Sequence, residues 1–127
     1  MNSMFAKIVR RILGCILIIF GLNILVPKAF IPLPVLPNNA AAFMTSLAAT
    51  GYLLKTVAVL EILIGVLLLL KKWVAFALIL LAPISLNILL FHFFLDASGV
   101  GGALIVAVLN GILIYKYWSS YRSLFHY

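Results

Sequence analysis

The sequence is poor in charge and in cysteine. Charged side chains make up 9% of its 127 residues, whereas 67% of the residues are hydrophobic. A water-soluble domain of this size could not cover so much apolar surface, so a lipid bilayer is the expected solvent. The single cysteine, Cys15, excludes an intrachain disulfide and a paired-cysteine redox motif. Too few histidines and cysteines share one depth to build a haem or protein-only metal site.

The basic residues, which give a net charge of +7, stand singly or in pairs between apolar runs. They form no basic face with interleaved aromatic residues, which argues against nucleic-acid binding. Only Lys28 and Lys55 fall on one side of the expected spans. Seven others fall on the opposite side: Lys7, Arg10, Arg11, Lys71, Lys72, Lys116 and Arg122. The positive-inside rule then predicts an inner-membrane protein with both termini in the cytoplasm.

Four long apolar runs predict an all-α fold, a single bundle of four transmembrane helices formed by residues 1–127. The expected spans are residues 8–26, 52–70, 73–95 and 103–118. Each approaches the roughly 20 residues that a helix needs to cross the hydrocarbon core.

The connections between the spans differ in character. Four of the five prolines fall between positions 27 and 37, which predicts an extended Pro-rich outer loop. A short interfacial helix should follow, capped by Asn38 or Asn39. Its apolar face should hold Phe43, Met44, Leu47 and Ala48. The glycine-rich residues 96–102 predict a tight, flexible turn between the last two spans.

The most informative polar residue is Glu61, near the middle of the second span. A carboxylate at that depth costs at least ~2.5 kcal/mol, so it needs compensation. Counting depth along the helices places other polar side chains between the midplane and the outer face. The resulting candidate polar cluster is Lys55, Glu61, Asn87, His92, Asp96 and Asn110, with Asn23 of the first span at similar depth.

Helical phase indicates how these groups are arranged. Lys55 and Glu61 lie about 120° apart around one helix, so Glu61 should turn toward the third or fourth span. Ser85, His92 and Asp96 share one face of the third span, where Asp96 can orient the imidazole. Pro83 of the same span should kink the helix.

Small residues predict where helices approach closely. Ala58 and Gly65 flank Glu61 on its own face of the second span. The fourth span carries a small-residue stripe that we expect to pack against them: Ala103, Ala107 and Gly111.

Several short motifs follow one another in a recognisable order. They are FIPLPVLP at 30–37, TGYL at 50–53, K-x5-E-x3-G (Lys55, Glu61, Gly65), LAP at 81–83 and N-x4-H-x2-L-D (Asn87, His92, Leu95, Asp96). Together they resemble the DoxX-like family of four-helix integral membrane proteins. The resemblance implies the four-helix fold. Some members of that family are subunits of thiosulfate:quinone oxidoreductases or of oxidoreductase complexes in oxidative-stress defence.

The expected function is an auxiliary subunit of a membrane oxidoreductase complex, with the catalytic cofactor on the partner. Glu61 would relay protons or contact a quinone, and His92 with Asp96 would bind a quinone carbonyl or shuttle protons. The alternative is that Glu61 only locks helices together and that His92 is only an interfacial histidine hydrogen-bonded at a helix end. The competing functions are a small transporter that uses Glu61 and a purely structural assembly factor in the lipid bilayer. The sequence leaves homo-oligomerisation open.

Overall fold

The computed structural model describes residues 3–26, 28, 31 and 35–125, and within these ranges the fold is all-α with no strand. Its α-helices are α1 (Met4–Leu25), α2 (Asn38–Ala49), α3 (Leu53–Leu70), α4 (Val74–Phe94) and α5 (Val100–Lys116). Short 3₁₀ helices are η1 (Ala97–Gly99), η2 (Trp118–Ser120) and η3 (Arg122–Phe125). The predicted fold class is therefore confirmed.

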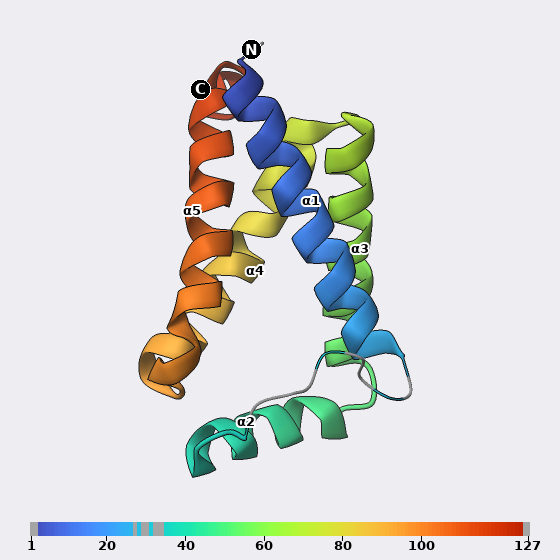
Figure 1. The fold of residues 1–127 in the computed structure, drawn as a ribbon, viewed down its shortest axis with the longest axis vertical. Coiled ribbons are helices and arrows are strands. Elements are labelled where there is room, and N and C mark those ends of the chain that lie inside the picture. The colour runs from blue at the N-terminus through green and yellow to red at the C-terminus, as the bar shows by residue number, and fades with distance from the viewer. Residues whose placement is uncertain (1–2, 27, 29–30, 32–34, 126–127) are drawn as a thin grey trace.

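Four of these elements are long and apolar enough to cross a membrane, namely α1, α3, α4 and the segment Ala97–Lys116 that contains α5. The chain is a multi-pass membrane protein. Both chain ends lie at one end of the bundle, here called the terminal end, and α2 lies across the opposite end, here called the α2 end (Figure 1). Helices α1 and α5 lie close together at the terminal end and diverge toward α2 (Figure 1).

The helix boundaries correct two predictions. Helix α1 begins at Met4 rather than at residue 8, because the Ser3 hydroxyl caps it by accepting a hydrogen bond from the Ala6 amide. Helix α5 already begins at Val100, so Gly101 and Gly102 are helical and the turn is reduced to η1.

The short helix α2 exists where it was predicted, but its cap differs. Pro37 is the N-cap residue and makes no side-chain cap bond, so neither asparagine caps the helix. The fixed backbone of Pro37 presents its carbonyl to the Ala41 amide instead, at 2.8 Å. On its inner side Ala40 is buried and Phe43 packs against Phe91 of α4, with ring centroids 5.6 Å apart.

Of the four residues predicted for the apolar face of α2, Phe43 contacts α4, Met44 and Leu47 are half-buried and Ala48 is exposed. Residues 27, 29–30 and 32–34 lie outside the described residues, so the expected Pro-rich loop is described only at positions 28, 31 and 35–37.

The core fills the terminal half of the bundle with aliphatic side chains. Its fully buried members are Leu13, Ile64, Leu68, Leu78, Leu81 and Leu113. The C-terminal segment closes over this core, since the Tyr121 hydroxyl donates a hydrogen bond to the Ala75 carbonyl at 2.6 Å. Burial, with a smaller contribution from Tyr117, raises the pKa of Tyr121 to about 12, so its phenol stays a donor at physiological pH.

Helices α1 and α3 make the closest helix pair. A methyl group built on Gly65 would lie 2.7 Å from the Gly14 carbonyl oxygen, and one built on Gly21 would lie 2.8 Å from the Ala58 carbonyl oxygen. Small residues let two backbones approach in a membrane, where van der Waals packing drives helix association.

The small-residue face of α3 therefore packs against α1, and the expectation that it meets α5 is wrong. The α5 stripe lacks such a partner at Gly111, which is exposed and has open space around it in the described structure. The glycines of α1 are spaced to face Gly65 and Ala58 at two successive levels, whereas Ala107 is only half-buried on α5.

We expect Gly65→Ala to lower the free energy of unfolding by about 1–3 kcal/mol, because the added methyl group would push α1 away from α3. Gly111→Ala is the matched control on α5, where no atom obstructs the methyl group. It should be neutral or raise stability by up to about 1 kcal/mol through helix propensity. Unfolding of both variants in detergent micelles, followed by circular dichroism, measures the difference. Equal stability of the two variants would contradict the assigned α1–α3 contact.

Candidate functional site

A cavity of about 360 Å³ lies between α1, α3, α4 and α5 in the half of the bundle nearer α2. Fifteen of the described residues line it, and four of these are polar: Asn23, Glu61, Ser85 and His92. The others are aliphatic residues, one phenylalanine, one alanine and two glycines. Leu17, Leu81 and Val106 belong to both the cavity wall and the hydrophobic core, so they close the cavity toward the terminal end.

The cavity reaches the bundle surface between α1 and α5. Its wall includes Phe20 and Ile24 of α1 and Gly102 of α5, all of which are exposed. These helices are the two that diverge toward the α2 end (Figure 1). Because the surroundings of this opening are apolar, it faces the part of the molecule that lipid covers.

The structure brings together only part of the predicted polar cluster. Glu61 and His92 both line the cavity. Asp96 and Asn110 are buried behind its wall, in contact with residues that line it. Lys55 is exposed beside a separate surface groove, and Asn87 is exposed on the surface of α4. Lys55 and Asn87 therefore do not line the cavity, because their helical phase turns them outward.

Glu61 is buried, with 5% of its surface exposed, and lies between Ala58 and Gly65 on the face of α3. No hydrogen bond or ion pair joins it to any described residue, so the partner expected on the third or fourth span is not found among them. Every fully buried side-chain oxygen among the described residues has a hydrogen-bond partner. Because the Glu61 carboxyl oxygens have none, they are not fully buried, and they border the cavity that Glu61 lines. Its hydrogen-bonding capacity is thus directed at whatever enters the cavity.

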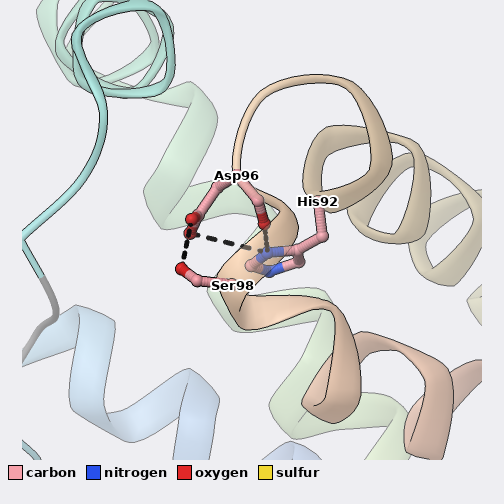
Figure 2. A network of polar contacts seen from close by, with 3 residues as sticks. All are labelled: His92, Asp96 and Ser98. Carbon is pink, nitrogen blue, oxygen red and sulfur yellow. Dashed lines mark hydrogen bonds and ion pairs between the residues drawn. The ribbon is translucent and has the colours of Figure 1, made fainter.

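His92 is held from behind by the turn that follows α4 (Figure 2). Its Nδ1 lies 3.1 Å from the backbone carbonyl oxygen of Asp96 and 3.7 Å from an Asp96 carboxylate oxygen. The Ser98 hydroxyl donates to the other carboxylate oxygen at 2.7 Å. Asp96 therefore orients the imidazole, as its spacing from His92 predicted.

These contacts assign the tautomer of His92. A carbonyl oxygen only accepts, so Nδ1 must carry the proton that it shares with Asp96. The Nε2 atom of the neutral ring is then left as an acceptor, on a residue that lines the cavity. Gly99 makes room for the ring, because a methyl group there would lie 2.5 Å from His92 Cε1.

Asn110 and Ser85 form a buried polar bridge between α5 and α4. The Asn110 amide donates to the Leu78 carbonyl at 3.1 Å and its oxygen accepts from the Ser85 hydroxyl at 3.3 Å. Helix α4 is continuous through Pro83, between these two contact points. The asparagine thus serves the helix pair and presents only Ser85 to the cavity.

Asn23 has a role that the depth count did not assign. Its side-chain amide accepts from the Ile31 amide at 2.9 Å and donates to the Ile31 carbonyl at 3.3 Å. This pair of hydrogen bonds anchors Ile31 at the cavity wall, next to the end of α1. A lone asparagine near the end of an apolar run was the available signal.

Comparisons with known protein families, with characterised proteins and with solved structures return no significant match for this chain. Within the described residues, no three side chains of His, Cys, Asp or Glu come together as a metal site.

We expect Asn110→Leu to lower the free energy of unfolding by about 1–3 kcal/mol, because it removes the two hydrogen bonds that join α5 to the Ser85 hydroxyl and the Leu78 carbonyl of α4. Asn87→Leu is the control, because this asparagine is exposed on the same bundle. Replacing it with leucine should leave stability unchanged or raise it. Thermal unfolding in micelles tests both, and a larger loss for Asn87→Leu would refute this division of roles.

Proposed function

We propose that this chain is a DoxX-like auxiliary subunit of an inner-membrane oxidoreductase complex and that its cavity holds the ring of a membrane quinone. One observation carries the proposal. A largely apolar cavity, open toward lipid between α1 and α5, carries a carboxylic acid and an oriented histidine on different helices. The polar part of the cavity is thus reached from the membrane, where quinones are dissolved.

The lining residues fit the chemistry of a quinone ring. A quinone is a flat apolar ring with carbonyl groups that need hydrogen-bond partners, so it suits aliphatic walls with few polar groups. Leu17, Ile84 and Val106 offer such walls. Ser85, Asn23 and His92 offer polar atoms along the same cavity. When bound, the quinone supplies the electron-transfer chemistry, and the chain contributes binding, orientation and protons.

His92 and Glu61 are the residues that we assign to proton handling. With Nδ1 bonded to the Asp96 carbonyl, His92 Nε2 is free to accept a proton or, once protonated, to donate one. No described residue forms a hydrogen bond or ion pair with the Glu61 carboxyl group. Glu61 lies on α3 and His92 on α4, so the two groups serve different parts of the cavity. The Asp96 carboxylate, 3.7 Å from Nδ1, helps to hold the imidazole in this orientation.

The charge distribution supports an orientation for this arrangement. Seven basic residues belong to segments at or near the terminal end, so the positive-inside rule favours an orientation with both termini in the cytoplasm. The cavity then lies in the outer half of the membrane. The polar residues of the chain gather at the same level.

The transporter alternative has less support. Alternating access requires a path from the bound substrate to both membrane faces. Fully buried leucines fill the bundle below the cavity: Leu13, Leu68, Leu78 and Leu113. A purely structural factor would not need the carboxyl group of Glu61 to border the cavity.

We expect Glu61→Gln to fold normally and to abolish quinone-dependent activity of the complex, because the amide keeps the shape of the side chain but cannot exchange a proton. The measurement is quinone reduction or oxidation by the complex purified from native membranes, with unfolding of the variant as the check on folding. Full activity of Glu61→Gln would exclude a proton-handling role for this residue.

A second variant tests the cavity itself. We expect Gly102→Leu to reduce the quinone extracted with the purified protein at least about tenfold, because the side chain would enter the cavity without a backbone clash. Gly101→Leu is the matched control, since this neighbouring glycine also has open space but does not line the cavity. Mass spectrometry of co-purified proteins and lipids measures both the quinone and the partner subunit. Equal quinone in both variants would refute the assigned site, and lipid in place of quinone would refute the ligand.

A further inference from the structure

Near the terminal end of the bundle, Arg10 joins the first part of α1 to the last turn of α3, and four more basic residues flank these two positions in the sequence. Arg10 of α1 donates a hydrogen bond through Nη1 to the Leu68 carbonyl of α3. Lys7 lies one turn before Arg10 on the same face of α1, and Arg11 follows it. Lys71 and Lys72 come directly after the last turn of α3. We call these five residues the basic seam.

The basic seam has no acidic counterpart in the chain. The sequence contains only two acidic residues. They are Glu61, at the cavity, and Asp96, beside His92 in the turn after α4. Arg10 is only 4% exposed, and the partner that the structure gives its guanidinium is a neutral carbonyl. The carbonyl end of α3 offsets part of this positive charge, and an anion from outside the chain would offset the remainder.

The backbone of the α3 end is unusual in a way that favours a binding role. Lys72 N–H bonds to the Leu67 carbonyl at 3.0 Å and Lys71 N–H to the Leu68 carbonyl at 3.3 Å, which is the Schellman pattern of a helix end. Lys71 adopts φ 56°, a position where glycine is ordinarily found. Trp73 is also left-handed, with φ 52°. Lysine thus occupies a left-handed backbone position that glycine would adopt with less strain. Such strained positions are common at functional sites.

The position of the basic seam indicates what kind of anion it meets. It lies where two membrane-spanning helices end, at the level of lipid headgroups. Trp73, 75% exposed, stands beside the lysines, and exposed Leu70 precedes them on α3. Tryptophan at this level marks the membrane interface, and leucine below it offers apolar surface to acyl chains.

We propose that the basic seam is a binding site for an anionic phospholipid, whose phosphodiester is held by Lys71, Lys72 and the α1 cations. The guanidinium and ammonium groups provide charge-assisted hydrogen bonds to phosphate oxygens. A bound phosphate also supplies the missing counter-charge to buried Arg10. The site is separate from the cavity and does not depend on its ligand.

The two tryptophans of the chain provide reporters for this site. Trp118→Phe leaves Trp73 beside the basic seam, and Trp73→Phe leaves Trp118, on η2 after α5, at the same end of the bundle. Each full-length protein is placed in phosphatidylcholine vesicles that contain either brominated phosphatidylglycerol or brominated phosphatidylcholine, which quench nearby tryptophan. We expect the anionic lipid to quench Trp73 preferentially and Trp118 without preference. Equal quenching of Trp73 by both lipids would overturn the proposal.

Charge variants in the Trp73 reporter assign the residues. Lys71→Gln and Lys72→Gln should each weaken the preference for phosphatidylglycerol about fivefold. The double variant Lys116→Gln/Arg122→Gln removes two charges from the same end of the bundle, near α5, and should leave the preference unchanged. An equal loss in that control would show a general surface potential and refute a localised site.

Lys71→Gly separates binding from folding. Glycine adopts the left-handed backbone at this position with less strain than lysine, so the protein should be at least as stable as the parent. Its preference for the anionic lipid should nevertheless fall about fivefold. Retained preference in Lys71→Gly would overturn the role of this lysine. Excess soluble glycerol phosphate should not compete with the brominated lipid, and full competition would assign the site to a soluble phosphate.

Discussion

The close approach of α1 and α3 at their glycines determines the form of this bundle. In lipid there is no hydrophobic force between helices, so the pair that can bring its backbones nearest gains the most packing energy. Gly14 and Gly21 of α1 and Gly65 of α3 permit this contact over two levels. Helix α1 consequently follows α3 toward the α2 end and leaves α5, with which it is in contact only nearer the terminal end (Figure 1). The cavity is the space that this divergence leaves between them.

A second constraint shapes the polar groups, since each polar atom in the hydrocarbon region needs a partner. Asn110 and Ser85 satisfy each other and the Leu78 carbonyl, and Asn23 satisfies the Ile31 backbone. His92 is satisfied on one ring nitrogen by Asp96. Glu61 alone among these cavity residues makes no hydrogen bond to the described chain. The polar residues thus divide into those that hold the fold and those that remain available to a ligand.

The basic residues divide in a similar way. Arg10 is buried and bonds to the Leu68 carbonyl, so a charged side chain takes part in the α1–α3 contact. Lys71 and Lys72, just after α3, remain exposed. The basic residues thus include a member that holds the fold and members that remain available to a ligand.

Prediction from sequence succeeds where the physics is local. Hydropathy over about 20 residues identified all four spans, because crossing a bilayer is a property of each segment by itself. The i, i+4 relation of His92 and Asp96 predicted their contact, because it lies within a single turn. Proline at position 37 overrode the expected asparagine caps, again a local effect that backbone geometry explains.

The sequence by itself therefore determined the all-helical, multi-pass architecture and the level at which polar residues gather. Only the tertiary structure decided which helices pair, that Lys55 and Asn87 face outward while Glu61 and His92 share a cavity, and that Arg10 is buried. The physical reason is rotational. Length and hydropathy set the depth of a residue, but the rotation of each helix depends on which small residues pack together, and several helices carry them. The glycines of α1 pack against α3, where the small-residue stripe of α5 was expected.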